Sequence, residues 1–366
     1  MVGGYMRQAL DLAREGQGLT SPNPTVGAVV VRDDQVVGRG FHTWAGRDHA
    51  EIVALREAGD AAQGATLYLT LEPCSHFGRT PPCVDTIIRS RVARVIAAME
   101  DPNPEVSGRG FAALREAGIE VELDNTARNE AELLNEGFVH FMRTGMPLVT
   151  IKAALTLDGK IAAPQDNLGW ITSEIARADV QQVRHLSDAI LTGLGTVLED
   201  DCLLTDRSGR ERARPLLRIV LDSQLRVPLT SKIITSAKGD VLVVGTSAAS
   251  PERRRALERA GVEVLIANGA AGRTDPKKVI EYLSENRYLS LMVEAGSKVN
   301  WTMLDSGFAD KVLFYYAPKI LGGLESLPVA GGKGRQRRAD AILLDRLRIH
   351  HISPDEFAVE AYLRKS

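Results

Sequence analysis

The stretch that decides the fold begins with His49-Ala50-Glu51 and ends with Pro73-Cys74-Ser75-His76-Phe77-Gly78-Arg79-Thr80-Pro81-Pro82-Cys83. One histidine and two cysteines are a usual ligand set for a catalytic zinc ion that keeps one coordination position open for water. A glutamate placed just after the histidine can move protons without binding the metal. The sequence therefore predicts a zinc site with His49, Cys74 and Cys83 as ligands and Glu51 as the catalytic acid and base.

The spacing of the two cysteines is wider than in the short form of this motif. Zinc deaminases of nucleobases carry H-x-E followed by P-C-x-x-C, whereas eight residues separate Cys74 from Cys83 here. Those eight residues include His76 and Arg79, and the planar fork of an arginine suits phosphate. Two interpretations remain open. The insert is a structural loop, or it holds the phosphate of a nucleotide-like substrate, and its composition favours the second.

These residues predict a hydrolytic reaction. Zinc lowers the pKa of water that it binds, so that hydroxide is available near neutral pH. Glu51 would take the proton from this water and later deliver it to the departing amine. The expected chemistry is addition of water to an amidine-like ring carbon, loss of ammonia, and gain of an oxo group by the ring.

Length and composition limit the class of protein. A chain of 366 residues is expected to form two domains. Its formal net charge of -2 argues against broad affinity for nucleic acid or an anionic membrane. Three cysteines cannot form a disulfide framework, and neither a signal-peptide core nor a membrane-length apolar run is present. We therefore expect a cytoplasmic protein.

Strand and helix patterns alternate along the first half, which indicates an α/β layered sheet. The expected strands are 27–31, 36–38, 66–71, 92–99 and 119–123, and the expected helices are 5–14, 49–58, 83–88, 110–117 and 127–143. The run Thr144-Gly145-Met146-Pro147 then breaks the pattern. We expect a first domain at residues 1–145 and a second at residues 146–366.

Four motifs of the first half together resemble a known family. They are Pro-Asn-Pro-Thr-Val-Gly at 22–27, His49-Ala50-Glu51, the long Pro-Cys insert and Asp101-Pro102-Asn103-Pro104. This set resembles the deaminase half of the bifunctional riboflavin-biosynthesis deaminase/reductase. The resemblance implies a cytidine-deaminase-like three-layer domain and a diaminohydroxyphosphoribosylaminopyrimidine as substrate. It places the substrate contacts on Asn23, His42, His76, Arg79, Asp101 and Asn103. For Asn23, His42, Asp101 and Asn103 taken singly, a role in forming turns is equally plausible.

The second half is expected to form a mixed sheet with an antiparallel edge. Its expected strands are 149–154, 188–193, 217–221, 241–244, 262–266, 289–293, 312–316 and 357–363, and the hydroxyls of Thr172 and Ser173 can cap a helix at 174–185. No G-x-G-x-x-G fingerprint occurs in this half. The glycine turns 193–196 and 294–297 meet helix starts and could offer amides to phosphate, although a plain tight turn is as plausible for each.

A second set of motifs resembles the reductase half of the same family. It comprises Lys152, Leu157-Asp158-Gly159, Trp170-Ile171-Thr172-Ser173, Ala189-Ile190-Leu191, Gly195-Thr196-Val197, Asp200-Asp201, Leu204-Thr205 and Lys319-Ile320-Leu321-Gly322-Gly323. The resemblance implies a dihydrofolate-reductase-like fold that binds NADPH. The implied reaction is hydride transfer that reduces the ribosyl group to a ribityl chain.

The resemblance also implies site residues in this half. NADPH would contact Ala154, Trp170, Thr196, Asp200, Ser223 and Gly296, and substrate would contact Arg184, Leu204, Arg207 and Glu294. An arginine on a helix face is more often only solvated, so the two arginines stay open. Two departures from the family pattern stand out. Cys202 replaces a usual proline, and Glu294-Ala295-Gly296 replaces a more glycine-rich turn.

Together the two resemblances imply a bifunctional enzyme of riboflavin biosynthesis, with zinc-dependent deamination followed by NADPH-dependent reduction. A homodimer or tetramer is expected from the resemblance. One alternative is a nucleic-acid deaminase, which would need basic or aromatic stripes that a chain with 5% aromatic residues lacks. Another is a binding protein with a structural zinc, which would need a fourth ligand, with His76 as the nearby candidate.

Overall fold

The chain folds into two compact α/β units in a computed structural model. The structure describes residues 3–43, 47–75, 82–104, 106–165 and 169–365. The first unit comprises Met1–Gly145 with Glu211–Arg214, and the second comprises Met146–Arg210 and Pro215–Ser366. The short segment 211–214 therefore belongs to the first unit, although it is far from residues 1–145 in the sequence.

The first unit is built on a five-stranded sheet. Its strands are β1 (Gly27–Arg32), β2 (Gln35–Phe41), β3 (Thr66–Leu69), β4 (Arg94–Ala97) and β5 (Glu120–Leu123), in the order β2-β1-β3-β4-β5. β1 runs antiparallel to both β2 and β3, whereas β3, β4 and β5 are parallel. All five expected strands are present, which confirms the α/β interpretation.

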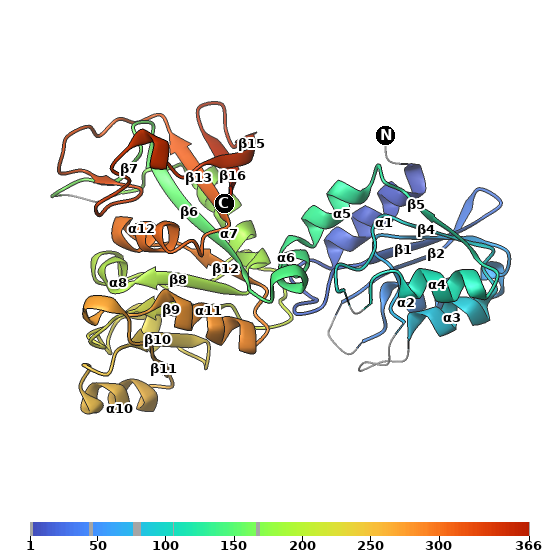
Figure 1. Ribbon diagram of the computed structural model, residues 1–366, viewed down its shortest axis with the longest axis horizontal. Coiled ribbons are helices and arrows are strands. Elements are labelled where there is room, and N and C mark those ends of the chain that lie inside the picture. The colour runs from blue at the N-terminus through green and yellow to red at the C-terminus, as the bar shows by residue number, and fades with distance from the viewer. Residues whose placement is uncertain (1–2, 44–46, 76–81, 105, 166–168, 366) are drawn as a thin grey trace. The chain divides into compact units, whose positions relative to one another are not determined.

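Helices cover both faces of this sheet. They are α1 (Gly4–Glu15), α2 (Ala50–Ala58), α3 (Cys83–Ser90), α4 (Arg109–Glu116), α5 (Arg128–Leu134) and α6 (Glu136–Thr144), with a 3-10 turn η1 (Gly59–Ala62). α1 and α5 lie on one side of the strands and α2, α3 and α4 on the other (Figure 1). Helix α2 packs directly on the backbone of β2, because a Cβ on Gly38 or Gly40 would lie 2.1 Å from Ala54 O or 2.3 Å from Ala50 O.

The helix expected at 127–143 is interrupted at Asn135, where the backbone has φ -114° and ψ 25°. The Asn135 side chain is buried and hydrogen-bonds the main chain of Thr25. Its Oδ1 accepts from Thr25 N at 2.7 Å, and its Nδ2 donates to Thr25 O at 2.9 Å. These bonds provide partners for the N–H and the C=O of Thr25, which are buried and take no part in strand pairing. A local helical pattern carries no information about hydrogen bonds to a residue 110 positions away, so the sequence predicted one continuous helix.

The second unit contains a nine-stranded sheet. Its order is β11-β10-β9-β8-β12-β6-β13-β16-β15, made of β6 (Leu148–Thr156), β8 (Ala189–Gly193), β9 (Leu217–Leu221), β10 (Val241–Gly245), β11 (Glu263–Ile266), β12 (Ser290–Val293), β13 (Lys311–Ala317), β15 (Leu344–His351) and β16 (Phe357–Leu363). Neighbours are parallel from β11 to β13, and β16 is antiparallel to β13 and β15. The expected mixed sheet with an antiparallel edge is confirmed.

Two strands were not expected from the sequence, β14 (Leu327–Pro328) and β15. Edge strand β15 was missed, because its charged residues and exposed apolar residues give no core-facing alternation. The return after Leu157-Asp158-Gly159 is β7 (Lys160–Ala162), which pairs with β14 (Leu327–Pro328) in a separate two-stranded sheet. The residues after this turn therefore pair with a strand that follows Gly323 in the sequence.

The helices of the second unit are α7 (Glu174–Leu186), α8 (Leu194–Asp200), α9 (Lys232–Thr235), α10 (Pro251–Arg259), α11 (Pro276–Glu285) and α12 (Ser297–Asp305), with 3-10 turns η2 (Ala270–Gly272) and η3 (Arg338–Asp340). Three of these helices, α7, α10 and α11, begin with a capping side chain, from Ser173, Ser250 and Asp275. Ser173 Oγ accepts from Ala176 N at 3.2 Å, as the sequence predicted. Among the described helices, none has the length and apolar character required to cross a membrane.

Replacing Asn135 with alanine should destabilise the first unit. The main-chain N–H and C=O of Thr25 would lose their partners while buried, which costs about 2–4 kcal/mol of unfolding free energy. Urea unfolding of the wild-type protein and of the variant measures this difference in unfolding free energy. Asn286→Ala is the control, because Asn286 is an exposed asparagine at the end of α11 that donates to Tyr282 O. Equal stability of the two variants would contradict the structural role of Asn135.

Candidate functional site

Three potential zinc ligands meet at one edge of the first unit. His49 is the N-cap of α2, Cys74 follows β3, and Cys83 is the first residue of α3. His49 Nδ1 lies 3.1 Å from Cys83 Sγ and 3.7 Å from Cys74 Sγ, and all three ligand atoms lie within 4.8 Å of one another. One imidazole and two thiols at this separation suit a tetrahedral zinc with one remaining position. The predicted triad is confirmed.

Hydrogen bonds among the three ligands lower the pKa of one thiol and raise the pKa of the other. The Cys83 thiol donates to Cys74, and this bond with those from His49 and from Cys83 N at 3.3 Å lowers the pKa of the Cys74 thiol to about 4. The pKa of Cys83 is raised by its bond with Cys74 and by burial. The pKa of His49 is raised, mainly by its hydrogen bond with Cys74. The two sulfurs therefore share one proton, which a bound cation would displace.

Glu51 lies in the first turn of α2, beside the triad. Its side chain is buried, and its Oε2 makes no hydrogen bond within the described residues. Burial raises the pKa of Glu51 to about 7, against the lowering effect of His49. A carboxyl group with this pKa can both accept and release a proton near neutral pH.

Two further predicted residues lie next to His49. The ring of His42 contacts the ring of His49 edge-on, with centroids 5.0 Å apart, and His42 Nε2 lies 3.3 Å from Asn23 Nδ2. His42 Nδ1 lies 3.2 Å from Asp48 O, so it donates there and leaves Nε2 to accept from Asn23. Burial lowers the pKa of His42, which favours this neutral form. The structure thus places Asn23 and His42 next to the zinc triad.

Asp101 and Asn103 lie on the segment after β4, which is attached to Glu72. The Glu72 carboxylate accepts hydrogen bonds from four main-chain N–H groups, those of Asp101, Gly108, Gly110 and Phe111. Asp101 Oδ1 accepts from Asn103 N at 2.8 Å. Sequence reasoning missed Glu72, although a carboxylate between an apolar strand and Pro73 was an available signal. His76 and Arg79 lie outside the described residues.

In the second unit, Glu294 is held between two cations. Its Oε1 accepts from Lys152 Nζ at 3.1 Å, and its Oε2 accepts from Arg184 Nη2 at 2.8 Å and Nε at 3.1 Å. Burial raises the pKa of Glu294, but the charges of Lys152 and Arg184 outweigh it and bring the pKa to about 2. Arg184 Nη1 also donates to Thr205 O at 3.0 Å. Arg184, predicted as a substrate contact, therefore also forms a buried ion group with Glu294 and Lys152.

Two predicted NADPH residues adjoin an open space. Gly296 is the N-cap of α12, and Thr196 lies in the first turn of α8. A Cβ on Gly296 would meet only Thr196 Oγ1, at 3.9 Å, and a Cβ on Gly195 would meet nothing within 4 Å. Both helices start at the carboxyl ends of neighbouring parallel strands, β8 and β12. This open backbone beside helix starts fits the anionic part of a dinucleotide.

Asp200 and Cys202 lie close enough to Glu294 for its charge to act on them. Burial raises the pKa of Asp200, and the charges of Glu199 and Glu294 add to this. Burial likewise raises the pKa of Cys202 to about 11, with contributions from Asp200 and Glu294. Cys202 is thus a half-buried neutral thiol at the edge of the ion group.

The other predicted residues of this unit have separate surroundings. Ala154 pairs with Tyr315 across β6 and β13, and Trp170 is exposed, with the guanidinium of Arg177 4.9 Å from its ring centroid. Ser223 O accepts from Thr246. The Leu204 side chain is buried in the core at a φ of 53°. Arg207 is exposed, and its N–H donates to Gln181. No described hydrogen bond or ion pair joins these five to Thr196, Gly296 or Glu294.

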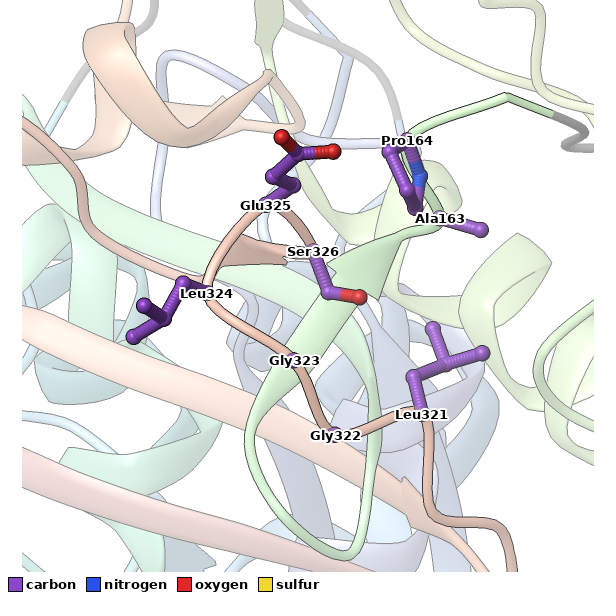
Figure 2. Close-up of a pocket in the computed structure, with 8 residues that line it drawn as sticks. All are labelled: Ala163, Pro164, Leu321, Gly322, Gly323, Leu324, Glu325 and Ser326. Carbon is purple, nitrogen blue, oxygen red and sulfur yellow. The ribbon is translucent and has the colours of Figure 1, made fainter.

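Two motifs from the sequence meet around a cavity lined by Ala163, Pro164 and the loop Leu321–Ser326 (Figure 2). The Asp158 carboxylate accepts from Leu321 N at 3.2 Å and Gly322 N at 2.8 Å. Lys160 Nζ donates to Gly323 O and Ser326 O. The turn after β6 thereby holds the glycine loop, while Leu324 points away from Ala163 and Pro164 (Figure 2). The cavity lining includes none of the predicted NADPH or substrate residues.

Two family profiles match the chain. Residues 3–99 match the cytidine and deoxycytidylate deaminase zinc-binding region. Residues 147–356 match the RibD C-terminal domain. The first match contains all three zinc ligands and Glu51, and the second contains every predicted residue of the reductase half.

Relatives match over nearly the whole chain. The riboflavin biosynthesis protein RibD of Bacillus amyloliquefaciens is 43% identical, covering 96% of this chain and 94% of its own. That of Escherichia coli is 42% identical, with 96% of each chain covered. Among solved structures, Acinetobacter baumannii RibD is 37% identical with a TM-score of 0.87, covering 99% of this chain and 98% of its own. A diaminohydroxyphosphoribosylaminopyrimidine deaminase/5-amino-6-(5-phosphoribosylamino)uracil reductase from Thermotoga maritima is 35% identical with a TM-score of 0.85, covering 98% of each.

Replacing Glu294 with glutamine should destabilise the second unit in a pH-dependent way. Lys152 and Arg184 would lose their counter-charge, at a cost of about 2–4 kcal/mol near pH 7. The pKa of Glu294 is lowered from 4.5 to about 2. Its stabilising effect is therefore present above pH 4.5 and lost as the pH falls toward 2.

Calorimetric unfolding between pH 7 and pH 3 should show the wild-type and variant curves converging at low pH. Glu281→Gln is the control, because Glu281 forms only exposed ion pairs with Lys277 and Lys278 and should have little effect at any pH. A stability difference that stays constant over this pH range would refute the assignment of the low pKa to Glu294.

Proposed function

Because the chain belongs to the RibD family of riboflavin-biosynthesis enzymes, we propose an assignment of its two reactions to its two units. The chain is a zinc deaminase and pyrimidine reductase. We assign deamination to residues 1–145 and reduction to residues 146–366. The observation that carries this assignment is the buried carboxyl of Glu51 beside the His49–Cys74–Cys83 group, which has no counterpart among the described residues of the second unit.

For the first unit, the proposed substrate is the diaminohydroxyphosphoribosylaminopyrimidine named for the Thermotoga relative. A zinc ion on His49, Cys74 and Cys83 supplies positive charge that activates water near neutral pH. Glu51, buried beside these ligands, would accept the proton of the attacking water and return it to the departing amine. Asn23 and His42 would orient the pyrimidine ring, since they adjoin His49.

The remaining deaminase contacts divide into two groups. Asp101 and Asn103 would hold substrate from the segment that Glu72 fixes. His76 and Arg79 would hold the phosphate, by the chemistry of imidazole and guanidinium. In this assignment the long insert between the cysteines recognises the sugar phosphate that the second reaction also needs.

For the second unit, we propose that NADPH binds along Ala154, Trp170, Thr196, Asp200, Ser223 and Gly296. The cofactor supplies a hydride that reduces the open-chain ribosyl group. Glu294 stays ionised between Lys152 and Arg184, so it can accept hydrogen bonds from sugar hydroxyls. Leu204 would contribute its main chain, because its side chain is in the core. Arg207 is exposed and would meet the phosphate.

We further propose that the protein is a cytoplasmic homo-oligomer. Its three cysteines are free thiols, as a reducing compartment requires. Edge strand β15 exposes Leu344, Leu347 and Ile349 beside an unpaired backbone edge. Exposed edges with large apolar side chains commonly pair with another chain. A second copy of this chain, pairing through β15, would cover them.

Replacing Glu51 with glutamine should lower the rate of ammonia release by about 10²–10⁴-fold, because the proton carrier is lost. Zinc content should stay at the wild-type level, since His49, Cys74 and Cys83 remain. Reduction of substrate that is already deaminated should also be unchanged, because that reaction belongs to the other unit. Metal analysis, an ammonia assay and NADPH absorbance measure the three quantities.

The matched control is Glu57→Gln, on an exposed position of the same helix, which should deaminate normally. Normal ammonia release by the Glu51 variant would reject the catalytic role. A simultaneous loss of NADPH oxidation would reject the division between the units.

The double change Leu347→Lys and Ile349→Lys should convert the oligomer to a smaller species, because it places charges on the apolar edge of β15. Light scattering during size-exclusion chromatography measures the mass. Leu324→Lys is the control, since Leu324 is fully exposed on a loop. An unchanged mass for the double variant would exclude β15 as the contact.

A further inference from the structure

We propose that Glu72 is a positioning residue for deamination, whose carboxylate fixes the main chain at Asp101 and Gly108 to the turn that carries Cys74. This inference rests on the proposed assignment of Asp101 and Asn103 to substrate. It adds a residue that contacts neither substrate nor metal in that proposal. Glu72 acts through the main chain of the segment that it holds.

Main-chain N–H groups surround the Glu72 carboxylate and donate hydrogen bonds to it. Its Oε1 accepts from Gly110 N at 2.9 Å and Phe111 N at 3.3 Å. Its Oε2 accepts from Asp101 N at 3.1 Å and Gly108 N at 2.9 Å. The residue is only 3% exposed. One carboxylate therefore joins Asp101 to Gly108 and to the first turn of α4.

These bonds suit a charged acceptor. Gly110 and Phe111 belong to the first turn of α4, whose N–H groups lack partners within the helix and carry the positive end of its dipole. Bonds from N–H groups to a carboxylate are about twice as strong as bonds between neutral groups. A neutral amide side chain could satisfy only one of the two N–H pairs, because its NH2 group would face the other pair.

Glu72 is also tied closely to the metal-binding turn. Only Pro73 separates it from Cys74, and Glu72 N donates to Met99 O at 3.0 Å. The start of α4 packs on this turn without a side chain between them, since a Cβ on Gly110 would lie 2.3 Å from Pro73 O. The turn that provides a zinc ligand and the segment that carries Asp101 therefore behave as one rigid piece.

The consequence for the reaction is preorganisation. Asp101 N is held by Glu72 while Asp101 Oδ1 accepts from Asn103 N, so the two proposed substrate residues keep a fixed main-chain position. When Glu72 cannot hold the segment, substrate binding has to order it first. That cost appears in KM, whereas the proton transfer by Glu51 is little affected.

The test uses full-length Glu72→Gln, Asp101→Asn and the double variant. We expect KM for ammonia release to rise at least tenfold in Glu72→Gln, with kcat within about threefold of wild type. Zinc content and NADPH-dependent reduction of deaminated substrate should be unchanged. The double variant should show the KM of the worse single variant rather than the product of both effects, because Glu72 acts through Asp101. Glu100→Gln, an exposed neighbour of the segment, is the matched control.

Each contrary outcome has a distinct meaning. A lower unfolding temperature with unchanged KM would show that Glu72 only stabilises α4. Loss of zinc would show that it supports the metal site instead, and multiplicative effects on KM would show that it acts independently of Asp101. All three overturn the proposal. Absence of ammonia release by the wild-type protein would instead reject the proposed function.

A second variant keeps the test valid if the glutamine chain does not fold. Glu72→Asp retains the charge, but its shorter side chain cannot bridge both pairs of amides. Its KM should rise by several-fold, with zinc and reduction retained. A wild-type KM for this variant would overturn the proposal.

Discussion

Close packing of α2 on the glycine backbone of β2 is the constraint on which the chemistry of the first unit depends. Without side chains at Gly38 and Gly40, the helix approaches the strand closely enough to bury Glu51. The same packing places His49, at the start of α2, beside Cys74 and Cys83. Burial then raises the pKa of Glu51 to about 7. A helix a few ångströms farther away would leave Glu51 hydrated and ionised, with weaker proton transfer near neutral pH.

Buried carboxylates organise both units, but each is stabilised in a different way. Glu72 is surrounded by main-chain N–H groups and Glu294 by the cations of Lys152 and Arg184. One oxygen of Glu51 has no hydrogen-bond partner among the described residues. The first two are held in place by their partners, and Glu72 also orders the main chain that carries Asp101 and Asn103. The third keeps its proton affinity available for the reaction. The surroundings of each carboxylate, rather than its residue type, separate structural from chemical roles.

The motifs allowed the zinc triad, the adjacent Glu51, both unit types and the mixed sheet with an antiparallel edge to be predicted from the sequence, and the structure and the similar proteins confirm them. Glu72 escaped notice because its partners lie about 30–40 positions away in sequence, at Asp101 to Phe111. Asn135 was placed inside a helix because its hydrogen bonds to Thr25 span 110 positions in the sequence. Strand β15 was missed because it is an exposed edge without a core-facing pattern. The contacts proposed for NADPH and substrate stay predictions.

The sequence by itself determined which chemistry is possible, since zinc ligation and proton transfer need particular side chains, and those residue types occur at recognisable spacings. It also determined the alternation of strands and helices, because local periodicity reflects burial on one face. Only the tertiary structure decided which polar side chains hold the protein together. It showed Arg184 within an ion group and Glu72 within a cage of amides. Burial and hydrogen-bond partners arise from contacts between distant segments, which no local pattern encodes.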